Sequence, residues 1–237
     1  MEEPAVIWDR PEPAKRPAPS PLSRESIVSA AIRLADAEGL EAVSVRKVAA
    51  ELDAGPMRLY GYLSTKEDLL DLMLDAAYGE IPLPDAAGQD WRSALRALAH
   101  GTRQTALQHE WFADLLGRRP HLGPHALAYL EASLAALDQA DEFETIDAVR
   151  LAVQTLHAYL IGALRGEIAE RRAERSTGLD KESWQRSSGP YLTRTLASGR
   201  YPTVAKFVQG AARPAPASTF DSGLDYVLDG IAAHSAR

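Results

Sequence analysis

The stretch Leu22–Leu70, LSRESIVSAAIRLADAEGLEAVSVRKVAAELDAGPMRLYGYLSTKEDLL, decides the fold. Ser23 is placed to cap a first helix, and Gly39 stands where a helix of that length would end. Ser44 caps a second short helix, and the residues between the caps repeat apolar side chains at helical spacing. A tight turn at 52–55 then leads into a third helix. The stretch therefore predicts three short, separately capped helices.

The third helix is expected over about 56–63. Pro56 suits its first position, because the N–H of a first helical residue has no partner within the helix. Asp53 lies in the turn, where Asp tolerates a left-handed backbone better than most residues. Ser64 is expected to cap the next helix, with Glu67 completing a capping box. A tight turn before a short exposed helix is the geometry of a helix-turn-helix, whose second helix reaches DNA base edges.

The rest of the chain divides into an arm and a helical bundle. Residues 1–21 contain six prolines, so we expect a flexible arm without helix, either a simple tail or a basic arm that touches the minor groove. After the breaks at Pro82, Pro84 and Gly88, helical periodicity returns. Helices are expected near 90–106, 111–116, 124–137, 143–175, 191–197 and 221–233, with a polar, mobile segment at 176–190. No strand pattern is present, and the predicted fold is all-α.

Composition limits the class of protein. The chain has 237 residues, a net charge of −7 and no cysteine, which excludes a disulfide framework, a thiol nucleophile and cysteine-ligated zinc. No apolar run is long enough for a membrane span, and no secretion signal is evident, so a soluble, cytoplasmic protein is expected. The acidic balance excludes a non-specific coat on a polyanion, so any DNA binding must come from a small local surface.

The residues of 22–70 resemble the DNA-binding domain of the TetR family of repressors. The matching features are Glu38-Gly39-Leu40, the run 44–49 (SVRKVA), Leu59-Tyr60 and the run 66–70 (KEDLL). Asp90-Trp91, the run 116–120 (LGRRP) and the long helix after Asp141 are similar to the tetracycline-repressor type of C-terminal domain. Asp53 and Gly61 depart from the family pattern, in the turn and in the recognition helix.

The resemblance implies a domain order and a function. It implies a helix-turn-helix domain at 22–68 and a ligand-binding and dimerisation domain at 69–237, in which 69–80 is a connecting helix. It implies a ligand-responsive transcriptional regulator, a repressor that binds a palindromic operator as a homodimer through its C-terminal helices. A small molecule would release it.

The resemblance also implies the DNA-facing positions. Arg46 matches a base-reading position, Met57 could touch a thymine methyl, and tyrosine hydroxyls could reach phosphates. Alternatively, these residues have no contact with DNA: Arg46 and Lys47 would lie on a solvent-exposed helix face, and Met57 and Tyr60 would pack in the core. The full set of expected DNA contacts is Ser44, Val45, Arg46, Pro56, Met57, Arg58, Tyr60, Tyr62 and Lys66.

The expected effector pocket consists of residues that interrupt or line the apolar stripes of the bundle. Leu115 stands where the tetracycline repressor carries a metal-binding histidine, so an apolar or weakly polar molecule is expected rather than magnesium–tetracycline. The expected lining is Leu98, Thr102, Leu115, Arg119, Pro120, Ser133, Val153, Gln154 and His157. The expected dimer face is Leu160, Leu164, Leu224, Val227, Leu228 and Ile231.

Two other classes of protein remain as alternatives, a helix-bundle enzyme and a helical interaction protein whose helix-turn-helix is only structural. His121 and His125 have a metal-ligand spacing, but Gly123 and Pro124 between them disfavour a regular helical turn, and no third ligand is apparent. No phosphate-binding glycine loop and no catalytic triad is apparent either. We expect no catalytic residues, no metal and no cofactor.

Overall fold

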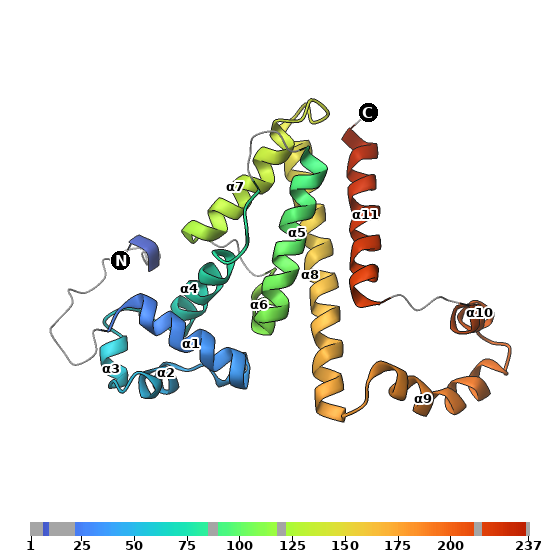
Figure 1. Ribbon diagram of the computed structural model, residues 1–237, viewed down its shortest axis with the longest axis horizontal. Helices are drawn as coiled ribbons and strands as arrows, with labels where there is room; N and C mark the ends of the chain where they lie inside the picture. Colours follow the sequence, from blue (N-terminus) through green and yellow to red (C-terminus); the bar gives the residue numbers. More distant parts are fainter. Residues whose placement is uncertain (1–6, 10–21, 85–89, 118–121, 211–214, 236–237) are drawn as a thin grey trace.

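The computed structural model describes residues 7–9, 22–84, 90–117, 122–210 and 215–235. Over these residues the chain has eleven α-helices, two short 3₁₀ turns and no strand. The all-α prediction is confirmed. Figure 1 shows a small group of helices, α1–α3, beside a taller bundle, and a pair of helices that extends from the far side of the bundle.

The small group comprises α1 (Arg24–Glu38), the 3₁₀ turn η2 (Leu40–Ala42), α2 (Val45–Glu51) and α3 (Pro56–Leu59). We call it the reader domain, after the role that the sequence leads us to expect. Ser23 and Ser44 cap α1 and α2 by accepting hydrogen bonds from backbone N–H groups. Gly39 ends α1 with a φ of +86°, a conformation that suits glycine. These caps are those that the sequence predicts.

Two details of the reader domain differ from expectation. Helix α3 ends at Leu59 rather than near residue 63. Thr65, and not Ser64, caps α4 (Lys66–Tyr78), and its capping-box partner is Asp68 rather than Glu67. The Asp68 carboxylate accepts from the N–H groups of both Ser64 and Thr65, at 2.7 and 3.2 Å. The cap is therefore set one residue later because one carboxylate can bind two successive amides there.

The bundle contains α5 (Trp91–Gln108), α6 (Glu110–Leu115), α7 (Pro124–Asp138), α8 (Ile146–Thr177) and α11 (Pro216–Ser235). Helix α4 lies against both α1 and α7, so it joins the reader domain to the bundle. Helix α11 lies along α8. The residues expected at a dimer face do not lie on an outer surface. Leu160, Leu164, Leu224, Leu228 and Ile231 are buried within the protomer, with Val227 packed against them.

The buried side of α7 also differs from its leucine pattern. Leu127 and Leu130 are exposed, whereas Tyr129, Ser133 and Leu137 are buried. Leucine and alanine occupy most positions around this helix, so its apolar pattern does not select one face. The helices packed against α7 decide which side is buried.

The segment 176–190, expected to be polar and mobile, is largely helical. It contains the end of α8 and the first half of α9 (Lys181–Leu196), and α10 (Pro202–Gly210) follows. Neither α9 nor α10 has a buried residue, and together they form the arm that extends from the bundle in Figure 1. At the other end of the chain, Ile7–Asp9 forms a 3₁₀ turn with Ile7 buried, although no helix is expected in the proline-rich region. The described helices include none that is long and apolar enough to cross a membrane.

Candidate nucleic-acid interface and effector pocket

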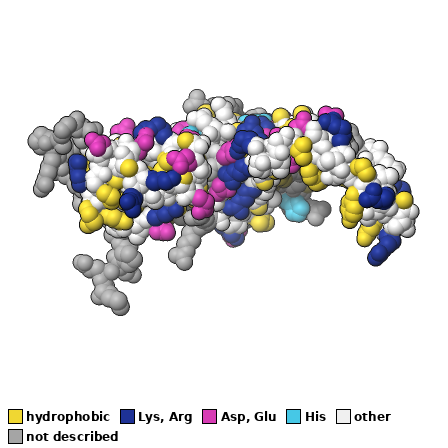
Figure 2. Space-filling view, turned by 90° about the horizontal axis from the view of Figure 1, so that it is seen from below, with side chains coloured by type: hydrophobic (Ala, Val, Ile, Leu, Met, Phe, Trp, Pro, Cys, Tyr) yellow, Lys and Arg dark blue, Asp and Glu magenta, His cyan; other side chains and the backbone are white. Residues whose placement is uncertain are grey.

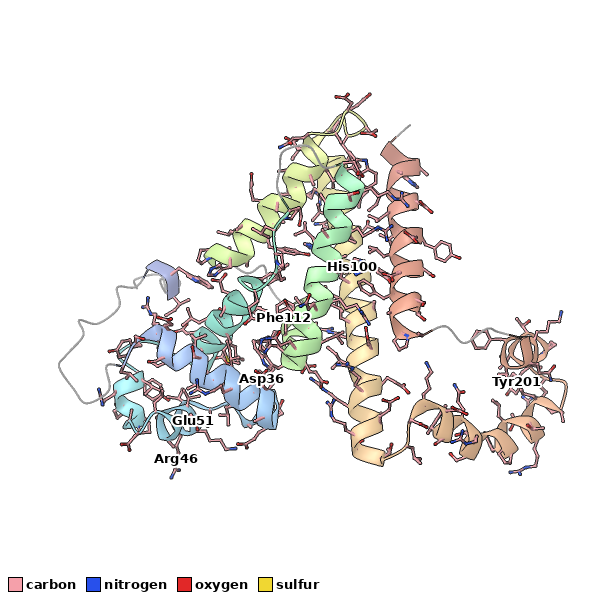
Figure 3. The ribbon with its side chains drawn as sticks, viewed as in Figure 1. Asp36, Arg46, Glu51, His100, Phe112 and Tyr201 are labelled. Atoms are coloured by element: carbon pink, nitrogen blue, oxygen red, sulfur yellow. The ribbon has the colours of Figure 1, made fainter. Side chains whose placement is uncertain are left out.

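The first turn of α2 presents one cation outward. The Ser44 hydroxyl accepts from the Lys47 N–H at 3.2 Å, which fixes the start of the helix. Val45 is buried in the domain core, whereas Arg46 is exposed. In Figure 3, Arg46 points away from the body of the molecule, at the lower edge of the reader domain. Within the described residues Arg46 has no ion-pair or hydrogen-bond partner, so its guanidinium is available to a ligand.

Helix α3 is short and presents its first residues to solvent. The turn before it holds Asp53 at φ +48°, the only non-glycine residue of the described chain with positive φ. Pro56 and Arg58 are exposed, and the exposed fractions of Met57 and Tyr60 are 80% and 49%. Met57 is therefore not a core residue. Leu59 alone anchors the helix in the core.

Tyr62 is committed to a contact inside the reader domain. Its hydroxyl donates to the carbonyl oxygen of Leu22 at 2.8 Å, and its own carbonyl oxygen accepts from Arg24 Nε at 3.2 Å. These two hydrogen bonds fasten the start of α1 to the segment after α3. The proton of the Tyr62 hydroxyl is therefore already engaged within the domain.

Lys66 is the first residue of α4, and its side chain is exposed. A helix N-terminus has unpaired N–H groups and a positive dipole end, which favour a phosphate. Lys47 lies near Arg46 in sequence but forms an ion pair with Glu38 at 2.8 Å. Figure 2, the view from below, shows basic and acidic side chains intermixed on this side of the reader domain. The surface is thus suited to a few directed contacts rather than to a uniform polyanion.

In the bundle, five of the expected pocket residues lie on three mutually packed helices. Leu98 and Thr102 come from α5, Ser133 from α7, and Val153 and His157 from α8, and every pair of these helices is in contact. Leu115 is also buried, but on α6. Gln154 is exposed and accepts from Arg150 at 3.2 Å, so it does not face this interior. Arg119 and Pro120 lie outside the described residues.

Tyr129, on α7, is the centre of the polar group in the bundle and is not among the residues that the sequence indicated. The Thr102 hydroxyl lies 3.0 Å from the Tyr129 hydroxyl, and Ser133 donates to the Tyr129 carbonyl oxygen at 2.8 Å. The Thr102 hydroxyl also lies 2.7 Å from the Leu98 carbonyl oxygen, so its single proton has two acceptors within reach. Burial raises the pKa of Tyr129 to about 12, which keeps the phenol neutral.

His157 packs against Tyr129 and has an unused polar atom. The two rings are stacked, with centroids 5.7 Å apart and an interplanar angle of 25°. His157 Nε2 is buried and has no hydrogen-bond partner among the described residues. Burial lowers the pKa of the imidazole, so the neutral form is favoured. A buried, unpaired nitrogen costs free energy unless a ligand supplies its hydrogen bond.

Aromatic rings connect this interior to the helix that carries the reader domain. Tyr78, in the last turn of α4, lies 5.2 Å from the Tyr129 ring and 5.3 Å from the Phe112 ring, centroid to centroid. Phe112 belongs to α6 and is labelled in Figure 3 between α4 and the bundle. These ring contacts join Tyr129 in the bundle to α4 through Tyr78.

A buried carboxylate makes a second connection between α4 and the bundle. Asp75 of α4 accepts from the N–H groups of His125 and Ala126 at 3.0 and 2.9 Å, and from His125 Nδ1 at 3.0 Å. It thus caps α7 from another helix. Gly123, the residue at the cap position, has no room for a side chain, because a Cβ there would lie 2.1 Å from the Asp75 carboxylate. Sequence spacing gave no indication of this contact, since the partners lie fifty residues apart.

Two family models match the chain, one for each part of the fold. Residues 27–73 match the bacterial regulatory proteins of the tetR family, and residues 83–235 match the tetracycline repressor-like C-terminal domain. The HTH-type transcriptional repressor DrrR1 of Streptomyces coeruleorubidus is 37% identical over 95% of this chain and 83% of that protein. An HTH-type transcriptional regulator of Saccharopolyspora erythraea is 36% identical over 97% and 92%.

Solved structures have the same fold. ActR of Streptomyces coelicolor without ligand has a TM-score of 0.76 at 22% identity and covers 92% of this chain with its whole length. The complex of ActR with actinorhodin has a TM-score of 0.77 at 23% identity, over 91% of this chain and 97% of that one. The relatives are named as transcriptional regulators, which favours a regulator over an enzyme. With both domains matched and relatives above 30% identity along almost its whole length, the chain belongs to the TetR family and is a ligand-responsive, DNA-binding transcriptional repressor.

Proposed function

We propose that the chain binds a palindromic operator as a homodimer, that α2 and α3 read each half-site, and that a small molecule bound in the bundle releases it. The observation that carries this proposal is Arg46 at the first turn of α2, which is exposed and has no partner within the described part of the chain, beside a recognition helix whose Met57 is also exposed. A guanidinium in that position can bridge guanine O6 and N7. Because the operator is intracellular DNA, we place the protein in the cytoplasm.

Seven residues make up the reading surface of this proposal. Arg46 and Arg58 would contact bases or phosphates, Met57 a thymine methyl, and Tyr60 and Lys66 the phosphate backbone. Ser44 and Pro56 begin the two helices and bring their N-terminal turns toward the groove. Val45 and Tyr62 are left out, because the first is buried and the second uses its hydroxyl within the domain.

A dimer follows from the size of the reader domain. One helix of four residues cannot select a site alone, whereas two copies can read half-sites one helical turn apart. The long helices α8 and α11 still present apolar side chains outward, including Leu151 and Tyr226, after their inner faces are filled. Trp184 and Tyr191 of α9 and Phe207 of α10 are exposed as well. We assign the dimer contact to these outer faces.

The effector site lies where α5, α7 and α8 meet. Its polar groups are the unpaired Nε2 of His157 and the hydroxyls of Thr102 and Tyr129. A neutral imidazole nitrogen accepts a hydrogen bond, so the effector should carry a hydroxyl or amide donor on an otherwise apolar, planar body that can lie against Tyr129. Leu115 offers no metal ligand, which argues against an effector that binds through a magnesium ion.

The test is selection of DNA fragments by the purified protein, followed by binding measurements with the selected site. Wild-type protein should retain a palindromic site, with an affinity that falls steeply with salt as counterions are released. Arg46→Ala should lose about 1–3 kcal/mol of binding to that site. Glu131→Ala, at an exposed position of α7 outside the faces assigned to DNA and to the dimer, is the control and should bind as the wild type does. Failure to select any site would contradict the proposal.

A further inference from the structure

The corner where the reader domain meets the bundle contains a histidine between two carboxylates. His109 joins α5 to α6, and its side chain is only 6% exposed. Its Nδ1 lies 2.8 Å from an Asp36 carboxylate oxygen, and its Nε2 lies 3.0 Å from a carboxylate oxygen of Glu80. Asp36 belongs to α1 of the reader domain, and Glu80 follows the end of α4. One ring thus touches the reader domain, the connecting helix and the bundle.

The link to Asp36 is built to persist. The Asp36 oxygen that faces His109 also accepts from Trp111 Nε1 at 2.7 Å. The indole and the imidazole lie 5.6 Å apart, centroid to centroid. Figure 3 shows Asp36 on the side of α1 that faces the bundle. Two donors from the bundle therefore hold one carboxylate of the reader domain, whichever form the ring takes at its other nitrogen.

The other nitrogen has a partner for each of its two states. When Nε2 carries a proton it can donate to Glu80, and the ring is then a cation between two anions. When Nε2 lacks a proton it becomes an acceptor, and the side-chain amide of Gln108 lies 3.2 Å away with an N–H to donate. Gln108 Nε2 also lies 3.4 Å from Glu80. Glu80 thus suits the protonated ring, and Gln108 suits the neutral one.

The remaining charges at this corner are already paired. Glu110, the next residue along α6, binds Arg172 and Arg175 of α8, at 3.4 and 2.5 Å. From α1 the group facing the ring is Asp36, from α4 it is Glu80, and from α5 and α6 they are the uncharged Gln108 and Trp111. The carboxylates of Asp36 and Glu80 are therefore the charges whose interaction with His109 changes when the ring gains or loses a proton.

We propose that His109 is a proton-sensitive latch, which ties the end of α4 to the bundle when it is protonated and frees that end when it is neutral. The latch regulates the DNA-binding function proposed above and rests on it. A protonated ring ties both Asp36 of the reader domain and Glu80 after α4 to the bundle, whereas a neutral ring ties Asp36 alone. Two reader domains that are already held by the protonated latch lose less conformational freedom when they bind one operator. A lower pH should therefore favour DNA binding.

The first test does not depend on DNA. The imidazole resonances of His109, identified by their loss in His109→Gln, are followed by NMR from pH 5 to pH 9. Glu80→Gln removes the anion that stabilises the protonated ring, so the midpoint of the titration should move to lower pH. Gln108→Leu removes the donor that stabilises the neutral ring, so the midpoint should move to higher pH. Midpoints that do not separate in these opposite directions would overturn the latch.

The second test measures the operator at two pH values. Between pH 8 and pH 6, the affinity of wild-type protein for its selected site should rise about threefold more than that of Glu80→Gln, the scale of a partly exposed ion pair. Glu131→Gln, an exposed carboxylate on α7, should follow the wild type. Equal changes in the wild type and Glu80→Gln would overturn the link to DNA binding. If no operator is bound at all, the proposed function fails, and the NMR result still decides whether the latch exists.

Discussion

The reading surface and the polar interior of the bundle differ in how far their polar side chains are exposed to water. On the reading surface, Arg46, Arg58 and Met57 are exposed, and the described residues offer the two arginines no partner. In the bundle, Thr102 and Tyr129 are buried and share a hydrogen bond, and His157 is desolvated with one nitrogen unused. The exposed cations of the reading surface suit contact with DNA phosphates and bases in water. The buried polar groups of the bundle suit a small molecule that is enclosed away from water.

The difference predicts how substitutions will behave. Removal of an exposed side chain from the reader domain leaves no cavity and no unpaired group, so it should change DNA affinity and leave stability almost unaltered. Removal of a buried polar group changes stability first, with a sign that depends on whether the group was paired. Stability and binding measured on the same variants therefore separate the two regions.

The largest effect is expected at Asp75. Asp75→Ala removes a buried carboxylate and leaves the N–H groups of His125 and Ala126 at the start of α7 without their acceptor, and should lower the free energy of unfolding by about 3 kcal/mol. Urea denaturation followed by circular dichroism measures the loss. Asp138→Ala, at the exposed end of α7, should change stability by less than about 0.5 kcal/mol. Equal effects of the two substitutions would remove the contrast between buried and exposed polar groups.

His157→Phe should have the opposite sign, because it replaces an unpaired polar atom by an apolar ring. We expect a gain of about 1 kcal/mol at pH 8, together with a weaker response to the effector. Burial lowers the pKa of His157, so below about pH 6.5 the unfolded chain binds a proton that the folded chain does not. This residue therefore costs stability as the pH falls. The gain should be larger at pH 5 than at pH 8, and denaturation at both values will show it. A loss at both would mean that His157 has a partner.

The smallest effect is expected at Lys66. Lys66→Ala should weaken selected and unrelated DNA by a similar factor, with stability unchanged, since a phosphate contact carries no sequence information. The dependence of log affinity on log salt should become shallower by about one. Glu131→Ala changes an exposed charged residue of α7, outside the faces assigned to DNA and to the dimer, and is the control. A selective loss of the operator alone would show that Lys66 reads a base.

The parts of the molecule predicted from sequence are those governed by neighbours along the chain. Ser23 and Ser44 cap the helices that they were expected to cap, and the helix expected over 124–137 begins at Pro124. Each signal spans three or four residues and needs no tertiary information. The exposed positions of α2 and α3 follow from the family resemblance combined with those caps.

The remaining features depend on contacts between distant residues. Tyr129 could not be distinguished from its neighbours on a helix that is apolar all round. The partners of His109 lie 73 and 29 residues away. Helices α9 and α10 bury no residue within the protomer, and α9 continues through Gly189 and Pro190, two residues that usually signal a break in a helix. In each case the deciding information lies in another element.

The cap that Asp75 provides for α7 also bears on how the protein folds. The first turn of α7 has no side-chain cap of its own, and its acceptor arrives only when α4 is in place. The two helices should consequently form and open together, as one cooperative unit of native-state hydrogen exchange. The connection between the reader domain and the bundle would then depend on α4 and α7 together. Local unfolding of one of these helices would destabilise the other.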